Sequence, residues 1–291
     1  MTIRFFSILI ALCATCAPGA LAQTSTAVAY KYANLTFPGA TTTSANGINN
    51  GNVVVGAYTD SSNASHGYIY SAGTYTAVNY PGAAQTSVLG ISDYNDIVGW
   101  YMLPGPSNLH GFRRHAGTFT SINYPGAQFG TVAAGINKGG TIVGSFDNSE
   151  GFIYQNGTYT KFDAPVYANG SPDTQLNGIN NLGQFVGQVF SGDNWRGFWV
   201  TGSDLDFLQP LFATDNQVTG INGRGDIVGC HDVSIGFISF AVESGEGSES
   251  TERFPRQQSL AGCASGINYA RVVVGNYWLG NAPQAFLGTP A

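Results

Sequence analysis

Apolar and polar positions alternate along this chain in short runs, and most of these runs stop at a glycine. The stretches 74–76 and 118–120 place an aromatic residue between two threonines, and 142–144 reads Ile-Val-Gly. A period of two residues, carried by β-branched and aromatic side chains between glycine turns, is typical of strands. The pattern therefore predicts an all-β chain whose short strands are separated by tight turns.

The predicted strands recur in a repeat of 42 to 46 residues. Each repeat contains Gly-Ile-Asn (once Gly-Ile-Ser), and the glycine of a Val-Gly pair follows nine residues after the first glycine. The first glycines of these motifs are Gly47, Gly90, Gly135, Gly178, Gly220 and Gly266. Four strands fit into each repeat: one ends in Gly-Ile-Asn, the second carries Val-Gly, the third starts near a Gly-aromatic pair and the fourth is rich in threonine. Six such repeats predict a six-bladed β-propeller.

The first and second strands of each repeat are joined by a turn of constant length. Its fourth residue is asparagine or glycine in five repeats, and these residue types tolerate the positive φ of a left-handed position. The sixth repeat has Arg271 there, where we expect a slightly strained turn.

The two ends of the chain complement each other. The sixth repeat stops at Ala291 before a fourth strand, whereas residues 30–40 resemble a fourth strand that no repeat precedes. We therefore expect this N-terminal strand to close the last blade and to cover its open edge. The alternative is an open solenoid, which needs atypical capping repeats at both ends.

Residues 1–22 resemble a secretory signal peptide. Arg4 precedes an apolar run from Phe5 to about Cys16, and a small-x-small cleavage site follows at residues 20–22. The run is too short to span a bilayer, and no later apolar stretch approaches the length of a membrane span. We expect a secreted protein, extracellular or periplasmic, with one propeller domain over residues 23–291.

The composition limits the classes of partner that the protein is expected to bind. The chain has 40 glycines, 10 % charged residues and a formal net charge of −6. Its scattered lysines and arginines offer no basic surface for nucleic acid or anionic membrane. We expect a monomer with no nucleic-acid partner and no membrane span.

Two of the four cysteines lie in the predicted signal peptide, and Cys230 and Cys263 remain. Cys230 follows Val-Gly on a second strand, and Cys263 precedes Gly-Ile-Asn on the next first strand. Alternation turns the two side chains to opposite blade faces, and opposite faces of neighbouring blades meet. In an oxidising compartment this arrangement predicts an inter-blade disulfide, and two free buried thiols are the alternative.

The connection between the second and third strands varies in length, while the hairpin on the other face of the disc does not. Variation on one face of a rigid scaffold is typical of binding loops. The candidate binding residues on that face are Asp60, His66, Trp100, His110, Asp147, Glu150, Asp193, Trp195, Arg196, Asp232 and Trp278. Together they would form a polar pocket with aromatic platforms, suited to a sugar or a peptide.

A structural interpretation competes for several of these residues. Asp60, Asp147 and Asp232 recur just after the second strand, which favours Asx-turns over ligand contacts. His66 and His110 share one repeat position, which favours a structural role for both. His231 replaces residues expected in the inter-blade core, so we expect a buried, hydrogen-bonded histidine.

The sequence predicts no cofactor. It contains no zinc-binding spacing and no nucleophile elbow. The loop 60–63 offers oxygen ligands for calcium but lacks the full calcium-loop pattern and its closing glutamate. Calcium therefore remains a secondary possibility.

The stretch Gly135 to Gly144 and the triplet His110-Gly111-Phe112 resemble the extracellular HAF-type repeat, over about residues 30–290. The resemblance implies a secreted bacterial repeat protein and no established reaction. Two functions stay open: a noncatalytic extracellular binding module for a carbohydrate or a protein, which we favour, and a polysaccharide hydrolase or lyase with carboxylates at the channel mouth. Fold alone does not choose between them.

Overall fold

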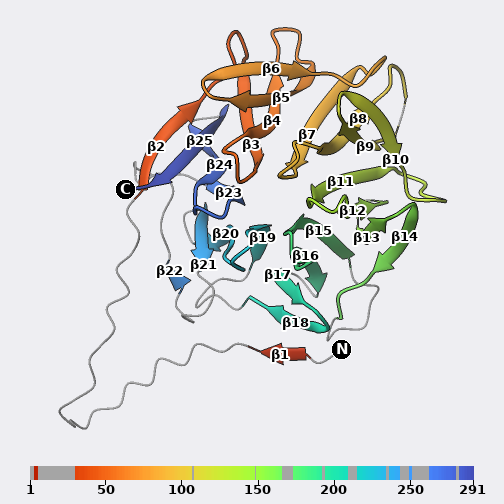
Figure 1. Ribbon diagram of the computed structural model, residues 1–291, viewed down its shortest axis with the longest axis vertical. Helices are drawn as coiled ribbons and strands as arrows, with labels where there is room; N and C mark the ends of the chain where they lie inside the picture. Colours follow the sequence, from red (N-terminus) through yellow and green to blue (C-terminus); the bar gives the residue numbers. More distant parts are fainter. Residues whose placement is uncertain are drawn as a thin grey trace.

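The protein is an all-β propeller (Figure 1). The computed structural model describes residues 3–5, 30–106, 108–147, 149–165, 173–191, 194–208, 215–233, 236–242, 249–250, 262–279 and 282–291. Within these ranges the strands form six sheets, five with four strands and one with five, and no helix is present. The sheets stand around a common axis (Figure 1).

The first three sheets follow the chain order from the axis outward. The first contains β3 (Thr42–Ile48), β4 (Val54–Thr59), β5 (Ser65–Ser71) and β6 (Thr74–Val78). The second contains β7 (Gln85–Ile91), β8 (Ile97–Met102), β9 (His110–His115) and β10 (Thr118–Ile122). The third contains β11 (Thr131–Ile136), β12 (Ile142–Phe146), β13 (Glu150–Gln155) and β14 (Thr158–Phe162).

The remaining sheets repeat this order, with additions at the ends of the chain. The fourth contains β15 (Asp173–Ile179), β16 (Phe185–Ser191), β17 (Asn194–Thr201), β18 (Asp204–Phe207) and β1 (Ile3–Phe5). The fifth contains β19 (Asn216–Ile221), β20 (Ile227–Val233), β21 (Gly236–Val242) and β22 (Glu249–Ser250). The sixth contains β23 (Gly262–Ile267), β24 (Val273–Leu279), β25 (Ala282–Pro290) and β2 (Tyr30–Leu35).

The N-terminal strand completes the last sheet, as the phase of the repeat predicts. β2 pairs antiparallel with β25 from Tyr30 opposite Pro290 to Leu35 opposite Ala285. Figure 1 shows the red β2 beside the blue β25. The first strand of the sixth sheet, β23, also lies against β3 of the first sheet. The sheets therefore close on one another around the axis.

Two segments differ from the simplest repeat. β1 adds to the outer edge of the fourth sheet, parallel to β18. The rest of the predicted signal peptide lies outside the described residues. The stretch 243–256 is rich in glutamate, serine and arginine, and this composition predicts a solvated loop. β22 lies within this stretch and pairs with β21.

The repeated Gly-Ile-Asn glycine lies where neighbouring first strands come closest. Each first strand has a register irregularity at this glycine, for example between Val88 and Gly90. A Cβ on Gly90 would lie 2.6 Å from the carbonyl oxygen of Ala134, and one on Gly135 would lie 3.0 Å from the Cα of Gly178. Any side chain would push the sheets apart, so the motif needs glycine because of close backbone approach.

The core lies between neighbouring sheets. The third strands contribute a large aromatic side chain at one repeat position, and these rings are fully buried in five sheets. They are Tyr68, Phe112, Phe152, Phe198 and Phe286. Valines of the second strands pack on them and fill the space between sheets.

Candidate functional site

The propeller has two unlike faces. The loop face carries the connections from second to third strands and from sheet to sheet. The hairpin face carries the six turns between first and second strands, at residues 49–52, 92–95, 137–140, 180–183, 222–225 and 268–271. The fourth residue of every turn has a positive φ, from 59° to 87°, and includes Arg271 at 62°. The turn chemistry expected from the sequence is thereby confirmed.

In five turns, the asparagine of Gly-Ile-Asn forms hydrogen bonds within its own turn and with the next sheet. Oδ1 of Asn49 accepts the backbone N–H groups of Gly51 and Val53, both at 3.0 Å. Its Nδ2 donates to the carbonyl oxygen of Ser92 in the second sheet (3.1 Å). In the same way, the side-chain amides of four further asparagines donate to the backbone carbonyl oxygen of the corresponding residue in the next sheet. The pairs are Asn137 to Asn180, Asn180 to Asn222, Asn222 to Asn268 and Asn268 to Asn49. Ser92 replaces the asparagine in the second sheet, and its Oγ accepts the backbone N–H groups of Tyr94 and Asp96.

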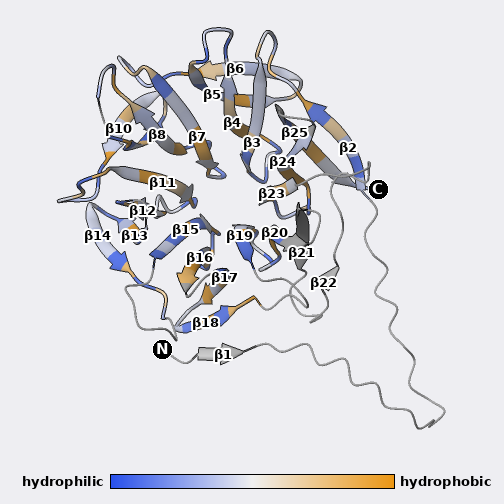
Figure 2. Cartoon of the chain, turned by 180° about the vertical axis from the view of Figure 1, so that it is seen from behind, coloured by the Kyte–Doolittle hydropathy of each residue, from blue (hydrophilic) through white to orange (hydrophobic). Residues whose placement is uncertain are grey.

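Two hollows lie along the axis and share isoleucines of the Gly-Ile segments. One, of about 70 Å³, is lined by the Gly-Ile segments of all six first strands. The other, of about 50 Å³, lies toward the hairpin face and is lined by these isoleucines and by turn residues, among them Asn49, Asn50, Asp93 and Asn181. Figure 2 shows hydrophilic residues at the inner tips of β3, β7, β11 and β15. Volumes of this size hold several water molecules.

A polar network joins turn residues that line this second hollow. The Asp93 carboxylate accepts the backbone N–H of Asn50 (3.0 Å), its Nδ2 (2.8 Å) and Nδ2 of Asn181 (2.6 Å). Oδ1 of Asn50 accepts the N–H of Tyr269 (2.7 Å), and Oδ1 of Asn181 accepts the N–H of Lys138 (2.9 Å). The network joins turns of the first, second, third, fourth and sixth sheets.

On the loop face, the structure brings Asp60 and His66 together. Oδ1 of Asp60 accepts the backbone N–H groups of Ser62 (2.8 Å) and Ala64 (2.9 Å), so the predicted Asx-turn is present. His66 lies between Oδ2 of Asp60 (Nε2, 3.0 Å) and Oδ1 of Asn79 (Nδ1, 2.8 Å). Partial burial alone would lower the pKa of His66, but these two acceptors raise it above its usual value. The His66 hydrogen bond, followed by the Ala64 N–H, lowers the pKa of Asp60.

Asp147 differs from its Asx-turn prediction. Its Oδ1 accepts the backbone N–H groups of Gln128 (2.7 Å) and Phe129 (2.6 Å), which belong to the preceding connection between sheets. Asp147 itself has a φ of 50°. It therefore ties two neighbouring loops together instead of capping its own turn.

The two repeated histidines take part in aromatic stacks. His66 stacks on Tyr58 and His110 on Tyr101, with ring centroids 5.0 and 5.1 Å apart. Phe37 covers the other end of the first stack, with its ring 3.7 Å from that of Tyr58. The stacks support the structural interpretation of both histidines. His231 is buried, as expected for the inter-sheet core.

The other predicted binding residues lie on different sheets. Trp100 is half-buried in the second sheet, Trp195 is half-buried and Arg196 exposed in the fourth, and Trp278 is exposed in the sixth. Glu150 of the third sheet forms an ion pair with Lys161 (2.5 Å). Asp193 lies outside the described residues. For Asp232 the structure describes the backbone alone, which pairs with Phe237.

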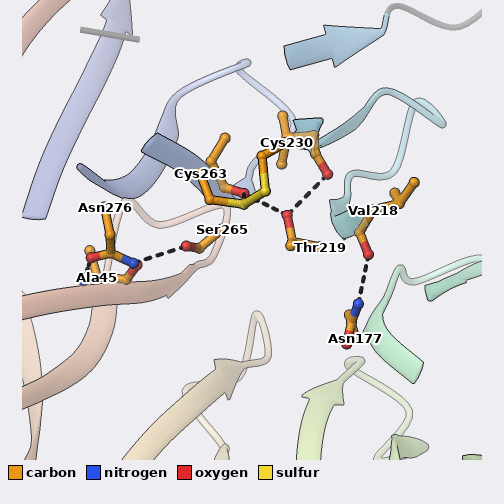
Figure 3. Close-up of a disulfide and its surroundings, with 10 residues drawn as sticks. Ala45, Asn177, Val218, Thr219, Cys230, Cys263, Ser265 and Asn276 are labelled. Carbon is orange, nitrogen blue, oxygen red and sulfur yellow. Dashed lines mark hydrogen bonds between the residues drawn. A yellow bond between two sulfur atoms is a disulfide. The ribbon is translucent and has the colours of Figure 1, made fainter. Parts of the chain in front are cut away.

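The predicted disulfide between Cys230 and Cys263 is present, with a Cα–Cα distance of 4.9 Å. It joins β20 of the fifth sheet to β23 of the sixth (Figure 3). Side-chain hydrogen bonds of two nearby residues also join neighbouring sheets. Oγ1 of Thr219 donates to the carbonyl oxygen of Ala264 (2.5 Å), and Asn276 exchanges two hydrogen bonds with the Ala45 backbone across the ring closure.

Within the ranges that the structure describes, no group of three or more histidine, cysteine or acidic residues could hold a metal ion. A search of the same ranges finds no helix with the length and apolar character needed to cross a membrane.

No protein-family model and no curated protein matches the sequence. Among solved structures, the chain is similar to TolB from Acinetobacter baumannii, with a TM-score of 0.52 and 10 % identity over 81 % of this chain and 63 % of TolB. The chain thus spans less than two thirds of TolB, and a likeness at this identity supports the fold alone.

Two further structures have lower TM-scores. The β-propeller domain of the Trilobed protease from Pyrococcus furiosus has a TM-score of 0.48 and 9 % identity, over 87 % of this chain and 94 % of that one. The fucose-specific lectin from Aleuria aurantia has a TM-score of 0.43 and 10 % identity, over 91 % and 97 %. At these values neither indicates a ligand or an activity.

Proposed function

We propose that the chain is a secreted, noncatalytic binding module of the HAF-repeat type, in which the six sheets are the blades of one ring. Its loop face binds an extracellular carbohydrate or protein. The signal-peptide pattern of residues 1–22 and the Cys230–Cys263 disulfide support export to an oxidising compartment. The domain then begins near Gln23.

The observation that carries this proposal is the set of exposed apolar side chains on the loop face. Leu103, Phe129 and Trp278 are 41 %, 66 % and 47 % exposed. Large apolar side chains held in water are typical of interaction surfaces, where aromatic residues supply much of the binding energy.

The loops that carry two of these residues are fastened to each other. Nδ2 of Asn108 donates to the carbonyl oxygen of Gln128 (2.7 Å), and the N–H of Thr131 donates to that of Leu109 (2.9 Å). Oδ1 of Asp147 also accepts the backbone N–H of Phe129 (2.6 Å). A surface fixed before binding loses less conformational entropy when a partner docks.

The alternative is a polysaccharide hydrolase or lyase. Such an enzyme needs carboxylates that can exchange protons with the substrate. Asp60 and Asp147 instead accept hydrogen bonds from loop backbone, and Asp60 is also bound by His66. Their engagement favours binding over catalysis.

The test is an immobilised panel of oligosaccharides and secreted proteins, probed with the mature chain. We expect retention on at least one member and a loss of affinity of about tenfold or more for Phe129→Ser. Lys31→Ser, an exposed substitution on the outer strand of the sixth sheet and away from both faces, is the control. Turnover of a polysaccharide that Asp147→Asn abolishes would establish the alternative, and retention that ignores Phe129→Ser would exclude the loop face.

A further inference from the structure

The hollow toward the hairpin face has the features of a second ligand site. We call it the hairpin mouth: the lining residues Asn50, Asp93 and Asn181, together with three exposed side chains, Tyr94, Leu182 and Tyr269, which directly follow lining residues in the chain. The sequence gives no hint of this site through loop length, because all six turns have the same length. What differs between them is the second and third turn residue.

Three of the six turns carry a large, exposed apolar or aromatic side chain. Tyr94 and Leu182 are the third residues of the second and fourth turns, and Tyr269 is the second residue of the sixth turn. The three large side chains are 72 %, 71 % and 51 % exposed. Neighbouring first strands follow the chain order around the axis, so the three turns that carry these side chains are separated from one another by one turn each.

Tyr269 is held in place by a cation–π contact. The guanidinium carbon of Arg224 lies 4.4 Å from its ring centroid. Gly223 leaves room for the ring, since a Cβ there would lie 3.4 Å from Cδ2 of Tyr269. The ring is therefore held in position, although half of its surface stays in water.

The lining residues retain hydrogen-bonding capacity of both kinds. Each side-chain amide has two N–H bonds, and the network of Asn50 and Asn181 described above uses one from each. The backbone N–H of Lys138 donates to Oδ1 of Asn181. The Asp93 carboxylate supplies acceptor oxygens.

We propose that the hairpin mouth binds the end of a neutral oligosaccharide. Hydroxyl groups both donate and accept, which suits a site of side-chain amides and one carboxylate. The apolar C–H faces of a sugar ring suit the exposed tyrosines of the neighbouring turns.

Other ligand classes fit less well. A purely apolar ligand would remove water from Asp93 and the amides without replacing their hydrogen bonds. An anionic ligand would meet the Asp93 carboxylate at this site. The inference concerns the face opposite to the loop face, so it does not depend on the function proposed above.

The experiment is a titration of the full mature chain with cellotetraose, maltotetraose and chitotetraose, followed by amide NMR. At about 10 mM sugar we expect at least one of them to shift the side-chain amide signals of Asn50 and Asn181, as a millimolar site would. Tyr94→Ala should weaken this binding by about tenfold. Phe129→Ala on the loop face, of similar exposure, should leave it unchanged.

The substituted side chains are largely in water, so the melting temperature of each variant should match that of the parent. Three results would overturn the proposal: no shift with any of the three sugars, shifts confined to the loop face, or equal affinity in Tyr94→Ala. The first two leave the loop-face proposal untouched, because that surface is tested through Phe129.

Discussion

Tyr68 shows how one residue departs from its own repeat. It lies where the second, third, fourth and sixth sheets have a buried phenylalanine. Its hydroxyl oxygen is buried without a hydrogen-bond partner in the described part of the chain. Burial, with a smaller contribution from Tyr75, raises the pKa of this phenol well above its usual range.

We predict that Tyr68→Phe raises the free energy of unfolding by about 1 kcal/mol, because an unsatisfied buried hydroxyl is removed while the ring stays. Chemical denaturation measures the change. The reverse substitution Phe152→Tyr in the third sheet is the control and should destabilise by a similar amount. A clear loss of stability in Tyr68→Phe would mean that the hydroxyl has a partner.

His66 should be pH-sensitive in a direction set by its two acceptors. Its pKa is raised above 6.5 in the folded protein, so its contribution to stability is complete below that value and is lost as the pH rises through the raised pKa. The pKa of Asp60 is lowered from 3.8, so its contribution is lost as the pH falls through the lowered value. NMR titration of the imidazole should give a pKa above 6.5, and Asp60→Asn should lower it.

Residue roles could be predicted where they depend on local sequence alone. The Asx-turn of Asp60 involves residues two and four positions ahead, which the sequence displays. Asp147 binds Gln128 and Phe129, and no local pattern indicates that the preceding connection lies within its reach. The role of the Gly-Ile-Asn asparagine was missed, although its recurrence in five repeats was the available signal.

At the scale of elements, the six hairpin turns are both local structures and joints between sheets. We predict that Asn137→Ala costs about 2–3 kcal/mol, since the backbone N–H groups of Gly139 and Thr141 and the carbonyl oxygen of Asn180 lose their partner. Asn137→Ser should cost less, because Ser92 shows that a hydroxyl can accept both N–H groups. Denaturant unfolding would rank the two variants, and equal losses would contradict this role.

The disulfide joins elements separated by 33 residues. Replacing both cysteines with serine should cost about 3–4 kcal/mol, chiefly because the unfolded chain regains freedom. Thermal unfolding of the double variant checks this, with the reduced parent as control. Labelling of the oxidised parent by a thiol reagent in denaturant would show that the bond is absent in solution.

Strand positions followed from the sequence because each element repeats the same alternation. The outer strand of the fifth sheet did not, because β22 is two residues long and lies in a stretch rich in glutamate and serine. Glutamate has a low β-propensity, so this strand depends on its pairing with β21 more than on the preference of its own side chains.

For the whole molecule, ring closure by β2 is the central feature. We predict that deletion of residues 23–40 exposes the edge of β25 and leads to unfolding or self-association. Size-exclusion chromatography and the melting temperature measure both outcomes. A peptide of residues 30–36, added back, should restore the monomer. An unchanged melting temperature in the truncated chain would reject closure.

The propeller was predictable as a whole, and the hairpin mouth was not. Repeat length and the phase of the two ends determine how the sheets follow one another. The mouth depends on which turn residues meet across the axis, such as Asp93 and Asn181, 88 positions apart. The connections on the loop face vary in length, and this variation can be recognised in the sequence. The six turns on the hairpin face have equal lengths and differ from one another only in their residues.

The pairing of β2 with β25 also determines how the ring responds to a pulling force. Tyr30 pairs with Pro290, so both ends of the chain leave the sixth sheet at the same side. Tension between the ends would load one residue pair at a time and unzip the two strands, instead of shearing all pairs together. The strand pair that closes the ring is thus the one that a pull on the termini loads directly, and we expect the ring to open there first.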